Sequence, residues 1–232
     1  MKIFAISDLH LSNSCDKPMD VFGGHWENYT EKIKENWKAK VSDEDMVLVA
    51  GDISWAMKLD EAKADLVWID ELPGKKIIIK GNHEYWWKSI SAVREILPES
   101  ILAIQNDAIK IDDYIFCGTR GWTVPESGKE VTDEDIKLYK REIERLKLTL
   151  TFAKNLKEEN DKIVAMIHFP PFGSGEEESE FTKLFEEFGV HTVVFGHIHG
   201  YTNCSLQTSI NGVRYFFTSC DHIKNDPVLI FE

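Results

Sequence analysis

Residues that can bind a metal ion follow five short apolar segments of this chain. The segments and the residues after them are Ile3–Ser7 before Asp8, Leu9 and His10; Met46–Ala50 before Gly51 and Asp52; Lys76–Lys80 before Gly81, Asn82, His83 and Glu84; Ile163–Ile167 before His168; and Thr192–Phe195 before Gly196, His197, Ile198 and His199. One such segment would indicate little, because an Asp or His after a strand is usually a cap or a turn residue. Five of them predict buried strands that present ligands along one edge of a sheet.

The side chains at these positions form a chemically consistent set. They are carboxylates, imidazoles and one amide: Asp8, Asp52, His10, His168, His197, His199 and Asn82. Such donors suit Mn, Fe, Zn, Ni or Mg and argue against a cysteine-rich structural zinc site. Seven candidate ligands exceed the four of a tetrahedral ion, and Asp52 could bridge two cations about 3.5–4 Å apart. A glycine before a ligand (Gly51, Gly81 and Gly196) would let the backbone turn sharply and approach the ions.

The spacing of apolar residues predicts an α/β fold in a single domain that spans residues 1–232. Continuous apolar runs predict buried strands at 3–6, 46–50, 76–80, 163–167 and 192–196, and helical patterns fall at 26–40, 58–72, 86–97 and 132–160. Two hairpins are expected, over 109–117 with a turn at Asp112-Asp113 and over 209–219 with a turn at Asn211-Gly212. Mixed strand directions predict two packed sheets with helices outside.

The five motifs, in this order, resemble those of the calcineurin-like metallophosphoesterases, and the match runs from residue 3 to residue 199. The resemblance implies a four-layer αββα sandwich of two mixed sheets and a dinuclear metal centre, with Mn or Fe favoured. It implies that one ion is bound by Asp8, His10, Asp52 and His199, and the other by Asp52, Asn82, His168 and His197. His83 would then face the substrate, where it stabilises the phosphoryl group or protonates the leaving oxygen. Many members have Asp where this chain has Glu84, and the longer carboxylate is expected to orient His83.

Other residues near the motifs are candidates for substrate binding. Arg120 follows a strand and either holds phosphate oxygens in its guanidinium fork or forms a surface ion pair. At least one of Trp55, Trp86 and Trp122 is expected to contact an apolar or base-like leaving group, although core packing is the simpler role for a tryptophan. Asn82 is also a candidate for contact with the phosphate of the substrate. His25, His191 and His222 lie outside the five motifs and are expected to be ordinary loop or surface histidines, although His222 follows an apolar strand and could come close to the ligands.

The function implied by the resemblance is hydrolysis of phosphomono- or phosphodiester bonds by attack of a metal-bridging hydroxide. A metal-binding protein-interaction scaffold of the same fold is the alternative, but it predicts gaps in the ligand set, and the sequence shows none. The net charge of −13 and the lack of a basic run argue against nucleic acid as a stable partner, whereas a small phosphorylated substrate remains compatible with two cations. Without a long apolar segment or paired cysteine motifs, we expect a cytoplasmic protein with no membrane partner and reduced thiols.

Overall fold

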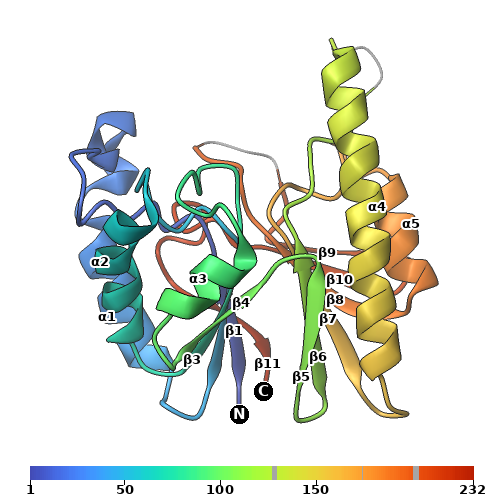
Figure 1. The fold of residues 1–232 in the computed structure, drawn as a ribbon, viewed down its shortest axis with the longest axis horizontal. Helices are drawn as coiled ribbons and strands as arrows, with labels where there is room; N and C mark the ends of the chain where they lie inside the picture. Colours follow the sequence, from blue (N-terminus) through green and yellow to red (C-terminus); the bar gives the residue numbers. More distant parts are fainter. Residues whose placement is uncertain (127–129, 174, 201–203) are drawn as a thin grey trace.

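The chain folds into two β-sheets that face each other, with helices on both outer sides (Figure 1). The computed structural model describes residues 1–126, 130–173, 175–200 and 204–232. This four-layer arrangement confirms the predicted αββα sandwich of mixed sheets. Within the described residues, no helix is both long and apolar enough to cross a membrane, and no disulfide joins the four cysteines.

The first sheet has five strands in the order β11-β1-β2-β3-β4. Their bounds are β1 Ile3–Ile6, β2 Met46–Val49, β3 Lys75–Ile79, β4 Ile101–Ile104 and β11 Val228–Phe231. Strands β1 to β4 are parallel, so their carboxyl ends meet at one edge, and β11 pairs antiparallel with β1. The two ends of the chain therefore lie side by side in one sheet (Figure 1).

The second sheet has six strands in the order β5-β6-β7-β8-β10-β9. Their bounds are β5 Asp107–Ile111, β6 Tyr114–Thr119, β7 Lys162–Ile167, β8 Val190–Phe195, β9 Gln207–Ile210 and β10 Val213–Phe217. The four central strands are parallel, and the antiparallel edges β5 and β9 come from the two predicted hairpins. Both hairpins turn at the predicted residues, where Asp112 and Asn211 have positive φ angles of 49° and 49°.

Period-two alternation of apolar residues builds the layers. Ile3 and Ala5 of β1 face the second sheet, whereas Phe4 and Ile6 face the helices α1 (Tyr29–Lys40) and α2 (Leu59–Asp70). The short helix α3 (Ile90–Ile96) lies on the same side, and α4 (Asp133–Leu156) and α5 (Glu180–Glu187) cover the second sheet (Figure 1). Two single turns of 3-10 helix, Met19–Phe22 and Gly24–Trp26, precede α1.

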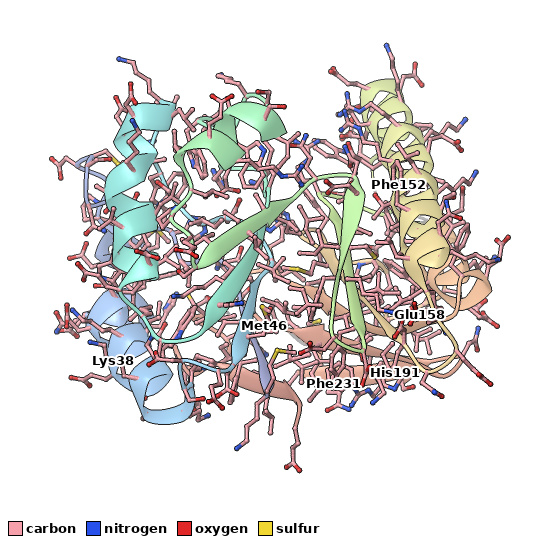
Figure 2. All side chains as sticks on the ribbon, turned by 60° about the horizontal axis from the view of Figure 1, so that its bottom comes forward. Lys38, Met46, Phe152, Glu158, His191 and Phe231 are labelled. Atoms are coloured by element: carbon pink, nitrogen blue, oxygen red, sulfur yellow. The ribbon has the colours of Figure 1, made fainter. Side chains whose placement is uncertain are left out.

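The two sheets pack through a shared apolar layer. Figure 2 shows Met46 and Phe231 in this layer, and the Phe231 ring of β11 lies 5.3 Å from the His191 ring of β8. Fully burying a Val, Ile or Phe side chain stabilises a fold by about 1.5–3 kcal/mol. This buried apolar layer therefore stabilises the packing of the two sheets against each other.

Several elements differ from the sequence-based expectation, among them α3, β4 and β11. The predicted helix at 86–97 begins only at Ile90, because Ser89 caps it with a hydrogen bond from the N–H of Ala92. Trp86 and Trp87 precede the helix and are fully buried. Strands β4 and β11 were not expected; each has only four residues and lies at or next to a sheet edge.

Candidate metal centre and its surroundings

The carboxyl ends of both sheets meet at one place, and the predicted ligands gather there. Asp8 and His10 follow β1, Asp52 follows β2, Asn82 follows β3, His168 follows β7, and His197 and His199 follow β8. Hydrogen bonds tie the two sheets together at this edge: the N–H of Ser7 donates to the carbonyl of Thr218 at 2.8 Å, and the N–H of Cys220 donates to the carbonyl of Ser7 at 3.0 Å. Ligands from two separate sheets therefore share one site.

The ligand side chains form two groups of three. Donor atoms of Asp8, His10 and His199 (the first triad) lie within 4.8 Å of one another, and so do those of Asp52, His168 and His197 (the second triad). Oδ2 of Asp52 is 3.4 Å from Nε2 of His168 in its own triad and 3.8 Å from Nε2 of His10 in the first triad. Asp52 thus stands between the triads, as a bridging carboxylate would.

The second triad crowds electron-donating atoms together. Nδ1 of His168 lies 2.9 Å from the carbonyl of Ala50, and because a carbonyl only accepts, Nδ1 must carry the hydrogen. Nε2 of His168 then points at Oδ1 of Asn82 at 2.7 Å, and Nδ1 of His197 lies 2.8 Å from the same oxygen. Either a proton or a cation must lie among these atoms, so the donor set fits a metal ion.

The first triad is held by a carboxylate that we did not anticipate. Asp221, just after β10, accepts from Nδ1 of His199 at 3.0 Å and from the N–H of Gly200 at 2.8 Å. This bond leaves Nε2 of His199 directed at Nε2 of His10, 3.1 Å away. The ring of His222, next to Asp221 in the chain, packs against the ring of Phe217, with centroids 4.6 Å apart. The signal for Asp221 was available, because it too follows an apolar strand.

Burial and charge set the protonation of the ligands. Burial lowers the pKa of His10 and of His197 to about 3, so both rings are neutral and offer lone pairs. Burial raises the pKa of Asp8. For His168 burial works against the charged form, but the Asp52 carboxylate raises its pKa to about 9. The Asp52 carboxylate thus favours positive charge beside His168.

The backbone at the ligands adopts an uncommon conformation. Asp8, His10, Asp52 and His197 have φ angles of 59°, 43°, 52° and 77°, in the left-handed region that costs non-glycine residues energy. Such strain persists where the surroundings enforce it, as they do at functional sites.

Two glycines leave room for the ligand carboxylates. A Cβ atom on Gly81 would collide with Oδ1 of Asp52, and one on Gly196 would collide with Oδ2 of Asp8. The close neighbours of these glycines are thus the carboxylates themselves, in addition to the expected approach of the backbone to the ions.

Glu84 does not orient His83, contrary to our expectation. Its buried carboxylate accepts the backbone N–H groups of Asp52, Ile53, Ser54 and Gly81. These bonds lock the turns after β2 and β3 against each other. The role of Glu84 is therefore to hold the loop that carries Asp52, and it faces the backbone instead of the substrate.

His83 and Trp55 lie at the open side of the triads. Nε2 of His83 is 3.9 Å from Oδ2 of Asp52, and its side chain is 33% exposed. Nδ1 of His83 is buried and has no hydrogen-bond partner within the described chain. Trp55 stacks on His10, with ring centroids 4.8 Å apart, and lies 4.4 Å from the His83 ring. A bound molecule that touches His83 would also meet this indole.

The other candidate substrate residues lie in different surroundings. Trp86 is fully buried, so the structure removes it from the substrate candidates. Arg120 packs over Trp122, with its guanidinium carbon 4.9 Å from the ring, and its Nη2 lies 3.7 Å from buried Glu142. Arg120 therefore has an ion-pair partner, and it also lines a cavity beside the centre.

This chain is similar to known proteins both in sequence and in fold. A family model described as calcineurin-like phosphoesterase matches residues 1–201. A probable cyclic nucleotide phosphodiesterase of Coxiella burnetii is 24% identical over 236 residues, which cover 97% of this chain and 85% of the relative. Two solved structures share the fold: phosphopantetheinyl hydrolase of Mycobacterium tuberculosis (TM-score 0.55, 16% identity, 94% and 89% of the two chains) and TT1561 of Thermus thermophilus (TM-score 0.56, 13% identity, 99% and 97%).

Proposed function

This chain belongs to the calcineurin-like phosphoesterase family, and on that basis we propose that it hydrolyses phosphomono- or phosphodiester bonds at a dinuclear metal centre. The observation that carries the proposal is the position of Asp52 between two triads of converging donor atoms. Residues 1–232 act as one catalytic domain in this proposal, because β11 completes the sheet that begins with β1.

The ligand assignment follows the two triads. One ion would be held by Asp8, His10, His199 and the shared Asp52, and the other by Asp52, His168, His197 and Asn82. When bound, two such ions supply Lewis-acid chemistry: they lower the pKa of a shared water, which becomes the nucleophile, and they neutralise phosphoryl oxygens. The imidazole and carboxylate donors are compatible with Mn or Fe, which we favour.

His83 and Trp55 would act on the substrate. The His83 side chain is partly exposed at the open side of the centre, where its ring can donate a hydrogen bond to a phosphoryl oxygen or a proton to the leaving oxygen. Trp55 presents its ring beside His83 and can stack on an apolar or base-like leaving group. Exchange of Trp55 for Phe should then raise KM for substrates with such a group.

Elemental analysis and a turnover assay test the proposal together. The purified protein should contain about two equivalents of metal and should hydrolyse bis-p-nitrophenyl phosphate or p-nitrophenyl phosphate in a Mn²⁺-dependent way. Cyclic nucleotides belong in the same panel, because the Coxiella burnetii relative is described as a probable cyclic nucleotide phosphodiesterase. Full metal occupancy without turnover of any of these esters would contradict the proposal and favour the scaffold alternative.

A further inference from the structure

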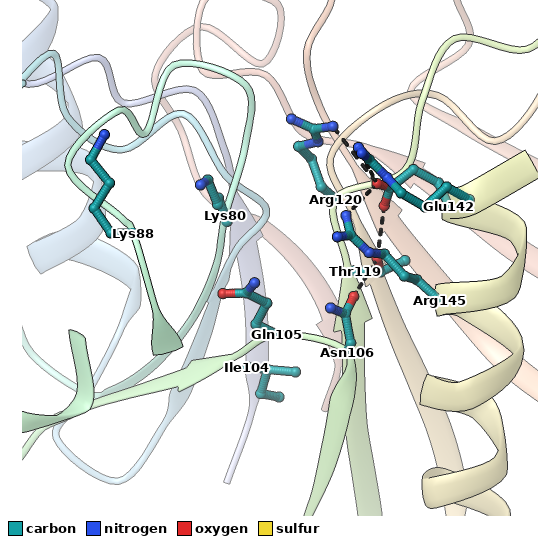
Figure 3. Close-up of a pocket in the computed structure, with 10 residues that line it drawn as sticks. Lys80, Lys88, Ile104, Gln105, Asn106, Thr119, Arg120, Glu142 and Arg145 are labelled. Atoms are coloured by element: carbon teal, nitrogen blue, oxygen red, sulfur yellow. Dashed lines mark hydrogen bonds and ion pairs between the residues drawn. The ribbon is translucent and has the colours of Figure 1, made fainter. Parts of the chain in front are cut away.

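A strongly basic cavity lies beside the candidate metal centre of this acidic protein. It has a volume of about 260 Å³, and five of its ten lining residues are cationic: Lys80, Lys88, Arg120, Arg141 and Arg145. Figure 3 shows the two lysines on the wall opposite Arg120 and Arg145. We call this cavity the basic pocket. Its charge is opposite to the formal net charge of −13, so it requires an explanation.

The basic pocket contains a single carboxylate among its lining residues, and one carboxylate cannot balance five cations. Oε1 of Glu142 is 2.6 Å from Nη1 of Arg145, 3.3 Å from Nη2 of Arg141 and 3.7 Å from Nη2 of Arg120. Glu142 is fully buried on α4 and also accepts from Thr119 at 3.3 Å. It therefore gathers three guanidinium groups and neutralises only one of their charges.

The two lysines add further positive charge to the basic pocket. Nζ of Lys80 donates to the carbonyl of Trp87 at 2.6 Å, and neither Lys80 nor Lys88 forms an ion pair within the described ranges. Lys80 and Lys88 lie across the pocket from Arg120 and Arg145 (Figure 3), so like charges repel one another over a short distance. An anion in the basic pocket would relieve that repulsion.

The walls of the basic pocket continue directly into the metal-ligand segments. Lys80 is followed in the chain by Gly81 and Asn82. The carbonyl of Arg120 accepts the N–H of His168 at 3.0 Å, so the backbone of this arginine positions a candidate ligand. A molecule with one phosphate at the triads could therefore reach the pocket with a second group.

We propose that the basic pocket is a subsite for a second, non-scissile phosphoryl group, and that the substrate is a small molecule with two separated phosphates. This inference rests on the proposed function. Guanidinium forks match phosphate oxygens, and the volume lies just below that of pockets for drug-sized ligands, which suits one phosphoryl group with a short stem. Free phosphate has the same chemistry, and the experiment below separates the two sources.

A series of alkane α,ω-bisphosphonates of increasing chain length tests the subsite without knowledge of the natural substrate. Each is compared with the alkyl monophosphonate of equal length, as an inhibitor of p-nitrophenyl phosphate hydrolysis and by calorimetry on the metal-loaded protein. We expect one length at which the bisphosphonate binds at least about tenfold tighter, because tethering makes the second contact intramolecular. Lys88→Ala and Arg141→Ala should each remove most of that advantage while monophosphonate binding and turnover stay within about twofold.

The control is Lys147→Ala on α4, the helix that also carries Arg141. Lys147 pairs with Glu144 at 2.7 Å outside the pocket, so this variant should keep the full advantage of the bisphosphonate. Equal binding of mono- and bisphosphonates at every length, with turnover intact, would overturn the subsite and leave the proposed function standing. If the wild-type protein did not hydrolyse p-nitrophenyl phosphate, the result would count against the proposed function. Calorimetry would still measure the preference for one bisphosphonate length. Sulfate-dependent turnover that both pocket variants abolish, without a bisphosphonate advantage, would assign the pocket to a free anion and overturn the proposal.

Discussion

Nδ1 of His199 lies 3.0 Å from Oδ1 of Asp221, a buried carboxylate that belongs to neither triad. We predict that Asp221→Asn weakens metal binding at the first triad about 10- to 100-fold, because the amide no longer supplies the charge that orients and polarises the ring. Titration against a competing chelator measures this loss. Asp226→Asn, which alters a partly exposed carboxylate paired with Lys40, is the matched control. Equal affinities for both variants would contradict the role assigned to Asp221.

His83→Ala should lower kcat by about two to four decades and leave both ions in place, because His83 acts on the substrate in our proposal. Elemental analysis and turnover of p-nitrophenyl phosphate measure the two effects separately. His191→Ala, on the far side beside Phe231, should retain full activity. Metal loss in the His83 variant would show that its role lies in binding the ions.

Asp52→Asn should disturb both ions at once, because Oδ2 of Asp52 faces His10 as well as His168. We expect the purified variant to retain well below about one equivalent of metal, whereas Asp8→Asn should retain about one. Elemental analysis after dialysis distinguishes these results. Retention of about one equivalent by the Asp52 variant would mean that this carboxylate serves a single ion.

Glu84→Gln should destabilise the fold by about 1–3 kcal/mol, since the new amide group presents hydrogens to backbone N–H groups that need an acceptor. Urea denaturation measures the change, and exposed Glu95→Gln on α3 should remain within about 0.5 kcal/mol of wild type. If Glu84 instead oriented His83, the variant would lose kcat at unchanged stability.

Asp45 should stabilise the fold near neutral pH and lose this effect in acid solution. It accepts the N–H of Lys2 at 2.7 Å and both the N–H and the hydroxyl of Ser42. Burial opposes the charge, but these bonds outweigh it and lower the pKa of Asp45. A carboxyl group with a depressed folded pKa contributes stability above its unfolded value of about 3.9, and this contribution is lost as the pH falls through the folded value.

Asp45→Asn should therefore cost about 1–2 kcal/mol at pH 7, and the difference from wild type should shrink in more acid solution. Urea denaturation of both proteins at pH 7 and near pH 3 measures it. A difference that stays constant over this range would show that the amide replaces the carboxylate fully.

The sequence predicted the parts of this protein that depend on local pattern. Buried parallel strands such as β2 and β7 are recognisable as apolar runs, and α4 begins close to the predicted residue 132, where Thr132 and Asp135 form a capping box. The edge strand β11 was missed because four apolar residues become a strand only by pairing with β1, more than 200 positions away. Ser89 was overlooked as a cap, so α3 was predicted too long.

The candidate site, too, was predictable from the sequence only where it depends on local pattern. Ligands at strand ends follow from the pattern, because carboxyl ends of parallel strands meet at one edge. The backbone bonds of Glu84 and the bond of Asp221 to His199 depend on three-dimensional proximity, which spacing does not encode. The basic pocket combines lysines near β3 with arginines of β6 and α4, so no basic run marks it in the sequence.

Pairing of β11 with β1 also bears on how the protein is made. Asp221 and β11 are translated more than 200 residues after Asp8 and β1, yet Asp221 binds the candidate ligand His199 and β11 pairs with β1. Earlier in translation the nascent chain holds Asp8 and His10 without the residues that complete their surroundings. A chain that terminates before residue 221 would therefore lack both the carboxylate bonded to His199 and the strand that pairs with β1.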